Sequence, residues 1–307
     1  MESSPVQRFV VPTRHAALAV SEFRPPRGTT ERATVVIVPG PGTTQNDVDG
    51  MLPVLTGSGF RICLYHHRGT GDSSASEQPY DNSIGTFVDD LRTVVWAIGG
   101  GPGPVHLVGL ELGGLAARSA TLSAPHEVRS LSLLGSGPSG KTCSLYDLLQ
   151  LAAVEATPDE ENGAWTMVAN QLREYGVPEA TLRRIDWWAR QASKPVRVGV
   201  SRAYASEPDR TAELKASRVP TFVIYGRTGD AWSTHIQTRM ADQLDAPRLV
   251  AQREGFEPYA LDPKRLAWGL VDFWSRIDND ESDYTAFDHR HSIQRRSGAP
   301  PILGLFG

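Results

Sequence analysis

The first half of the chain alternates short apolar runs with longer segments whose apolar residues recur at helical spacing. The apolar runs, each of which predicts a strand, are residues 9–12, 16–20, 33–38, 60–65, 105–108 and 128–134. The segments at helical spacing are residues 48–55, 84–98 and 115–122. Strands that alternate with helices form a mostly parallel sheet covered on both faces, so we predict an α/β fold. Such sheets carry their sites at the carboxyl ends of the strands.

This alternation stops near Pro138 and resumes only about eighty residues later. Three helical segments are predicted between these points, at residues 145–154, 163–175 and 178–192. The strand and helix patterns that follow are residues 221–225, 234–244, 247–252 and 263–277. We therefore predict a core of residues 1–138 and 217–277, an inserted helical lid of residues 139–216, and a flexible tail of residues 278–307.

The composition and net charge indicate which classes of partner the protein is expected to bind. Of the 307 residues, 40% are hydrophobic and 21% are charged, as in an ordinary globular protein. A net charge of −4 predicts neither a nucleic-acid surface nor a basic membrane surface. The start of the chain lacks a signal-peptide pattern and no apolar run approaches a membrane span, so we expect a cytoplasmic protein. The oligomeric state is not indicated.

No cofactor is expected from the sequence. The two cysteines, Cys63 and Cys143, make neither a disulfide framework nor a zinc-binding spacing. Lys141 in Gly140-Lys-Thr142 lacks the upstream glycines of a phosphate-binding loop. We therefore expect no metal and no organic cofactor, and a small molecule as the partner.

Two glycines flank a glutamate between a predicted strand and a predicted helix, in Gly109-Leu-Glu-Leu-Gly113. This framework resembles the nucleophile elbow, G-x-S-x-G, of the α/β-hydrolases. Four more stretches resemble that family in the correct order: Val38-Pro-Gly-Pro-Gly42, His66-His-Arg-Gly-Thr-Gly-Asp-Ser73, Pro220 to Asp230, and Gly255-Phe-Glu-Pro258. The resemblance covers nearly the whole chain apart from the lid and the tail. It implies an α/β-hydrolase fold with a mostly parallel twisted sheet.

The chain departs from the family pattern at the residues that perform hydrolysis. Glu111 stands at the serine position, Phe256 at the histidine position, and Pro41, which has no N–H, at the position of an oxyanion donor. Only Asp230, at the acid position, keeps its type. Loss of the nucleophile and base costs on the order of 10⁶ in rate, and loss of one oxyanion donor costs roughly 10²–10³ more. The resemblance therefore implies a member that is not an ordinary serine hydrolase.

A carboxylic acid displayed at the elbow suggests different chemistry. A carboxyl group that is partly removed from water can act as a general acid or base near neutral pH. We expect Glu111 to have this role, assisted by Asp230 and by His66, whose strand lies two places from the elbow strand, or about 10 Å away. The residues expected to contact substrate are Pro41, Leu112, Trp187, Trp232 and Phe256. By analogy with natural-product cyclases and lyases that resemble this fold, the expected reaction is cyclisation, elimination or isomerisation of an apolar small molecule.

Other interpretations of these residues remain open. Glu111 as a covalent nucleophile, like the Asp of related dehalogenases and epoxide hydrolases, would still need a histidine-activated water. The chain could instead be a non-catalytic ligand-binding or scaffold protein, with Glu111 a solvated charge and His66 packing its own turn. A third interpretation is a hydrolase with another nucleophile, such as Ser136 in Gly135-Ser-Gly137.

Overall fold

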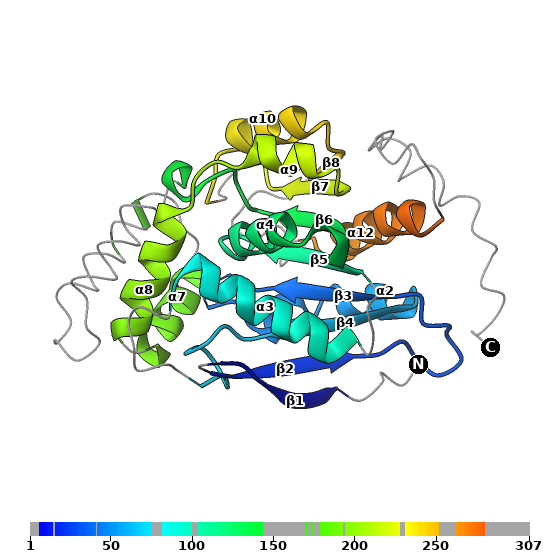
Figure 1. Ribbon diagram of the computed structural model, residues 1–307, viewed down its shortest axis with the longest axis horizontal. Helices are drawn as coiled ribbons and strands as arrows, with labels where there is room; N and C mark the ends of the chain where they lie inside the picture. Colours follow the sequence, from blue (N-terminus) through cyan, green and yellow to red (C-terminus); the bar gives the residue numbers. More distant parts are fainter. Residues whose placement is uncertain are drawn as a thin grey trace.

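A single sheet forms the centre of the computed structural model (Figure 1). The structure describes residues 6–14, 16–40, 42–74, 82–99, 104–143, 170, 173–174, 179–192, 194–227, 231–251 and 262–279. In this part of the chain the sheet has eight strands in the order β1-β2-β4-β3-β5-β6-β7-β8. The strands are β1 (Gln7–Pro12), β2 (Ala17–Phe23), β3 (Ala33–Val38), β4 (Phe60–Tyr65), β5 (Val105–Leu110), β6 (Val128–Leu134), β7 (Thr221–Tyr225) and β8 (Arg248–Val250).

The sheet is parallel from β4 to β8, and only β1 and β2 run antiparallel to their neighbours. This confirms the predicted α/β-hydrolase arrangement of a mostly parallel sheet. Strand β3 separates β4 from β5, so the segment after β4 lies two strands from the elbow, as predicted. The helices are α1 (Gln45–Val48), α2 (Leu52–Gly57), α3 (Ile84–Gly99), α4 (Gly113–Ser123), α7 (Glu179–Gln191), α8 (Lys194–Ser206), α9 (Thr211–Ser217), α10 (Thr234–Leu244) and α12 (Pro263–Asp278).

Helices cover both faces of this sheet because its strands are apolar on both sides. In β3, Val36 and Val38 join a core formed with α3, α4 and α10, whereas Val35 and Ile37 join a core formed with α1, α2 and α12. A strand that is buried on both faces appears in the sequence as a continuous apolar run, which is why these strands could be predicted. Among the described helices, none is both long and apolar enough to cross a bilayer.

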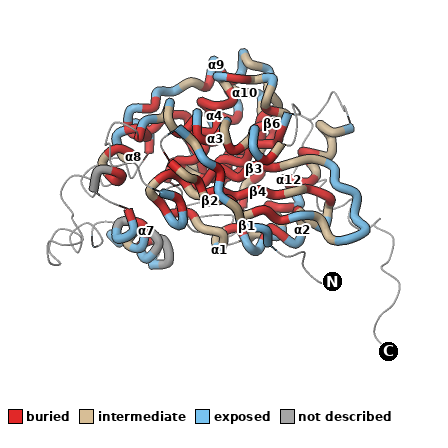
Figure 2. Tube along the Cα trace, turned by 60° about the horizontal axis from the view of Figure 1, so that its bottom comes forward, coloured by how far each residue is buried: buried red, intermediate tan, exposed pale blue. Residues whose placement is uncertain are grey.

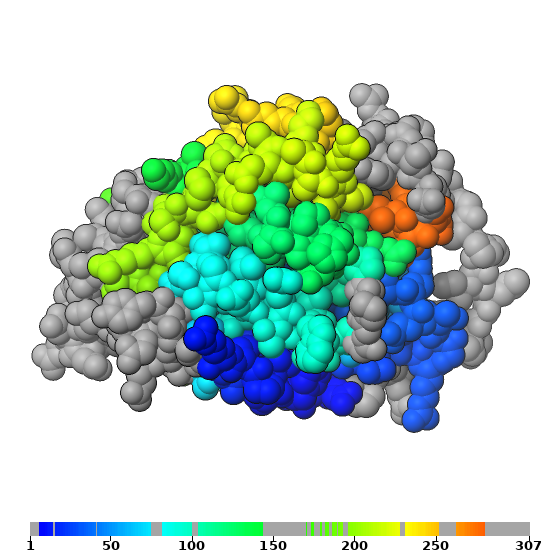
Figure 3. Space-filling model, in the orientation of Figure 1, coloured from blue at the N-terminus to red at the C-terminus, as the bar shows by residue number. Residues whose placement is uncertain are grey.

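The inserted segment lies beyond the carboxyl ends of the parallel strands, where α7 and α8 are found (Figure 1). Helix α7 corresponds to the helix predicted at 178–192, whereas most of the two helices predicted at 145–154 and 163–175 falls outside the described residues. In Figure 3 the yellow-green atoms of α8 adjoin the cyan atoms of α3. The Tyr204 ring of α8 stacks on Phe87 of α3 with centroids 5.7 Å apart. Figure 2 shows exposed residues along α7, whereas most of the described residues of α8 are buried. Helix α9 returns to the core and packs against α4 and α10.

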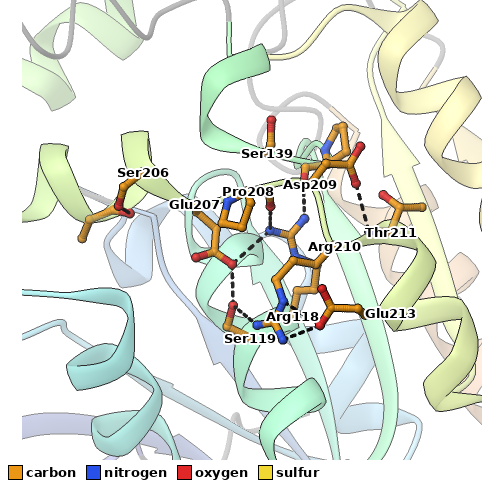
Figure 4. A network of polar contacts seen from close by, with 12 residues as sticks. Arg118, Ser119, Ser139, Ser206, Glu207, Pro208, Asp209, Arg210, Thr211 and Glu213 are labelled. Carbon is orange, nitrogen blue, oxygen red and sulfur yellow. Dashed lines mark hydrogen bonds and ion pairs between the residues drawn. The ribbon is translucent and has the colours of Figure 1, made fainter.

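Both ends of the insertion are held by one buried side chain, Arg118 of α4 (Figure 4). Its guanidinium donates to the carbonyl of Pro138, just before the predicted insertion, and its Nη2 donates at 2.9 Å to the carbonyl of Pro208, near the end of the insertion and three residues before α9. Glu207 pairs with the same guanidinium at 3.2 Å and also accepts from Ser119 Oγ at 2.6 Å. Burial lowers the pKa of Arg118, and Glu207 opposes this effect. The lid is therefore anchored to the helix that begins at the elbow.

Candidate active site

Glu111 occupies a strained turn between β5 and α4. Its backbone has φ 51°, a left-handed conformation that costs a non-glycine residue about 1–3 kcal/mol and is found preferentially at functional sites. Its amide donates to Leu134 O of β6 at 2.8 Å, which fixes the turn to the neighbouring strand. A Cβ on Gly109 would lie 2.4 Å from the Cα of Gly114, so strand and helix approach too closely for any larger residue. This turn has the form of the predicted elbow.

The loop after β3 passes directly over this turn. A Cβ on Gly40 would lie 3.3 Å from Oε2 of Glu111, and a Cβ on Gly113 would lie 2.3 Å from the carbonyl oxygen of Pro39. The carboxylate of Glu111 therefore lies against Gly40. Glu111 is only partly buried, so that solvent or a small molecule can reach it. The site has the position expected for a parallel sheet, at the carboxyl ends of β3 and β5.

His67, which follows β4, holds the same loop from the other side. Its Nε2 lies 2.8 Å from Pro39 O, a carbonyl that can only accept, so Nε2 carries the hydrogen. The hydroxyl of Tyr204 from α8 lies 3.2 Å from the same nitrogen. Burial lowers the pKa of His67 to about 4, so the ring is neutral at pH 7. The histidine pair at 66 and 67 made both residues candidates from the sequence, but only His66 was placed in the predicted site, and Tyr204 was not predicted at all.

His66 makes its described contacts within its own turn. Its Nδ1 accepts from the amide of Asp72 at 3.2 Å, and the ring lies so close to Gly71 that a Cβ there would be 2.3 Å away. Burial lowers its pKa, while Asp72 acts in the opposite direction. The alternative that His66 packs the turn thus has direct contacts in its support, and an assisting role beside Glu111 remains a prediction.

Arg68 fastens this turn to α3. Its guanidinium makes two hydrogen bonds to Asp90, from Nε at 2.7 Å and from Nη2 at 2.6 Å, and both side chains are buried. A two-pronged pair of this kind fixes position as well as supplying energy. This pair therefore ties the turn that contains Arg68, next to His67, to α3.

The predicted substrate-contacting residues fall in different environments. Leu112, next to Glu111, is buried. Trp187 is 39% exposed on α7, whereas its neighbour Trp188 is buried. Trp232 was expected at the rim of the site, but its ring is fully buried against Gly137 and its Nε1 donates to Ser139 O at 2.9 Å. Trp232 therefore fills the space between two strand ends and does not present its ring to a ligand.

Three of the predicted site residues lie outside the described residues: Pro41, Asp230 and Phe256. Their roles remain predictions. Within the parts of the chain that the structure describes, no three His, Cys, Asp or Glu side chains gather closely enough to hold a metal ion.

Ser136, the other proposed nucleophile, is enclosed by the elbow. It is fully buried, and its Oγ would lie 2.3 Å from a Cβ placed on Gly114. No described residue hydrogen-bonds to this hydroxyl. A nucleophile needs an adjacent base and access to substrate, and the described surroundings of Ser136 offer neither.

The sheet order, the elbow and the lid position define the class of the protein, and comparison with known proteins agrees. The family of the alpha/beta hydrolase fold matches residues 33–252, and the chain belongs to this family. Three solved structures are similar over 87–89% of this chain and 99% of their own chains. They are a thermophilic esterase from Thermogutta terrifontis (19% identity, TM-score 0.71), a hydrolase from Pseudomonas aeruginosa PA01 (20%, 0.69) and the enol-lactonase from Burkholderia xenovorans LB400 (15%, 0.68). At these identities the similarity establishes the fold alone.

Proposed function

We propose that this chain is a non-hydrolytic enzyme on an α/β-hydrolase scaffold, in which Glu111 is the general acid or base. The substrate class is an apolar small molecule, and the reaction is a cyclisation, elimination or isomerisation driven by proton transfer. The observation that carries the proposal is the strained Glu111 turn, with φ 51° and its carboxylate against Gly40. Strain of this kind persists where the surrounding structure imposes it, most often at functional sites.

The surroundings of Glu111 favour proton transfer over covalent catalysis. A glutamyl ester would have to be released by a water that an imidazole activates. His67 already uses its Nε2 hydrogen on Pro39 O, and His66 Nδ1 accepts from its own turn. Phe256 stands at the family's histidine position, and neither of these two described imidazoles is placed to serve as the base for that step. Proton transfer by Glu111 itself needs no second group of this kind.

A probe reaction that does not require the natural substrate tests whether Glu111 acts as a base. Eliminating the C3 proton of 5-nitrobenzisoxazole requires only a base: the proton moves to the carboxylate, the N–O bond breaks, and a cyanophenolate is released. We expect the full-length protein to catalyse this elimination and Glu111→Gln to lose at least about 10²-fold of that rate. The pH–rate profile should lose its carboxylate limb in the same variant. Equal rates and profiles for the two proteins would exclude Glu111 as the base.

The competing functions predict different results in parallel assays. A hydrolase that uses Ser136 would cleave p-nitrophenyl esters in a way that survives Glu111→Ala but not Ser136→Ala. A ligand-binding protein without catalysis would bind apolar compounds equally well with Glu111→Gln and would turn over neither probe. The solved structures with similar folds include hydrolases, so the ester assay is the necessary comparison.

A further inference from the structure

Three elements meet at the buried imidazole of His67. The residue follows β4, its Nε2 reaches Pro39 O in the loop after β3 at 2.8 Å, and Tyr204 Oη of lid helix α8 lies 3.2 Å from the same nitrogen. The ring also packs against Tyr65 and Phe87, with centroids 5.4 and 5.0 Å away.

The carbonyl that His67 holds belongs to the loop that passes over the Glu111 turn. Pro39 O lies where a Cβ on Gly113 would be 2.3 Å away, and the next residue, Gly40, lies against Oε2 of Glu111. Any movement of the Pro39–Gly40 peptide therefore changes the packing and solvation of the carboxylate. These two properties govern how readily a carboxyl group gives up or accepts a proton.

The two ring nitrogens of His67 differ in their contacts, and the difference indicates why a histidine is present here. Nδ1 of His67 is buried and has no hydrogen-bond partner among the residues that the structure describes. A buried acceptor without a donor is unfavourable, and an apolar side chain of similar shape would avoid that cost. The one polar contact that favours histidine here is therefore the donor at Nε2.

We propose that His67 is a positioning residue for Glu111: its Nε2–H holds the Pro39–Gly40 peptide against the Glu111 carboxylate, and Tyr204 ties this contact to lid helix α8. The assignment rests on the proposed function in that it concerns the same carboxylate. It differs from the role expected for His66, because His67 does not touch the substrate.

The test follows the Glu111 carboxyl in the full-length protein without any substrate. The titration midpoint of its ¹³Cδ resonance, identified by its absence from Glu111→Gln, is compared among variants. His67→Leu removes the donor, and we expect the midpoint to move by at least about 0.5 pH units. His67→Gln keeps an N–H donor at similar reach, and we expect less than half of that change.

His106→Gln is the matched control. His106 is also fully buried; burial lowers its pKa while Asp278, 3.3 Å from its Nε2, acts in the opposite direction, and its Nδ1 lies 2.8 Å from Ser130 Oγ. It stands near the start of β5, about five residues or roughly 16 Å along the strand from Glu111. We expect this variant to be destabilised while the Glu111 midpoint stays where it is in the wild type.

The assignment is overturned if His67→Leu and His106→Gln are destabilised alike and both titrate like the wild type. Should His67→Leu fail to fold, Tyr204→Phe and His67→Gln carry the test. Tyr204→Phe is expected to shift the amide resonance of Gly40, and an unchanged Gly40 amide in both variants refutes the coupling. Failure of the proposed function is distinct: Glu111→Gln would then retain the elimination rate although the titration differences persist.

Discussion

The guanidinium of Arg68 donates two hydrogen bonds, of 2.7 and 2.6 Å, to the carboxylate of Asp90, and neither side chain is more than 2% exposed. Removing one partner would leave the other charge buried and uncompensated. We predict that Asp90→Ala lowers the free energy of unfolding by about 3–5 kcal/mol, measured by urea denaturation. Arg92, on the same helix, pairs with Glu127 at the surface, so Arg92→Ala should cost less than about 1 kcal/mol. Similar losses in the two variants would contradict the distinction.

The strained backbone at Glu111 should lower the stability of the fold while it keeps the carboxylate in place for catalysis. Glycine adopts φ 51° without strain, so Glu111→Gly is predicted to raise the free energy of unfolding by about 1 kcal/mol or more, while abolishing the elimination activity. Arg218→Gly is the control, because Arg218 has φ 59° at the end of α9, away from the elbow. It should stabilise to a similar degree and leave activity intact. A destabilised Glu111→Gly would show that the carboxylate, and not strain, dominates at this turn.

The buried His67 should make the fold sensitive to acid. Its pKa is about 4 in the folded protein and about 6.5 in the unfolded chain, so the unfolded state binds a proton first as the pH falls. The contribution of His67 to the free energy of unfolding is therefore fully present above pH 6.5. It is lost as the pH falls from 6.5 to 4, by about 3 kcal/mol in all. The free energy of unfolding of His67→Gln, followed across this range, should fall less steeply. His66 and His106 are present in both proteins, so their contributions cancel. Parallel curves would contradict the prediction.

The hydroxyl of Ser136 should be required neither for the stability of the fold nor for activity. Its hydroxyl is buried without a described partner, so Ser136→Ala is predicted to change the free energy of unfolding by no more than about 0.5 kcal/mol, and to stabilise if it has any effect. The control is Ser119→Ala, because Ser119 Oγ donates to Glu207 at 2.6 Å. Loss of that bond to a charged group should cost about 1.5–3 kcal/mol. Loss of activity in Ser136→Ala would revive the hydrolase interpretation.

Most strands could be predicted because burial on both faces leaves an uninterrupted apolar signal. The 48–55 segment shows the limit of such patterns: Val48, Met51, Leu52 and Leu55 are all buried, as their spacing predicted, yet the helix is broken into α1 and α2. Gly50 and Pro53 lie at and just after the break, and each disfavours a continuous helix. Periodicity predicts which face is buried better than it predicts whether the backbone is continuous.

The backbone turn at Glu111 could be predicted from the sequence because it depends on local chain geometry, whereas the role of each site residue stays a prediction. Glu111 at the elbow follows from two glycines within five residues. In contrast, the distinction between His66 and His67 depends on how the chain leaves β4, and on Pro39 and Tyr204, which lie 28 and 137 residues away. Trp232 was misplaced for the same reason, since the carbonyl that holds it belongs to Ser139, 93 residues earlier. Contacts of this range leave no trace in a single sequence.

The Arg118 guanidinium brings together the two ends of the segment between Pro138 and Pro208. The carbonyls of Pro138 and Pro208 converge on one side chain, so the insertion leaves the core and re-enters it at nearly the same place. A segment whose ends coincide can be lengthened, shortened or exchanged while its host keeps the same backbone. Residues between the two prolines could therefore be replaced, naturally or by engineering, with the backbone of the strained Glu111 turn kept, provided that Tyr204 still reaches His67.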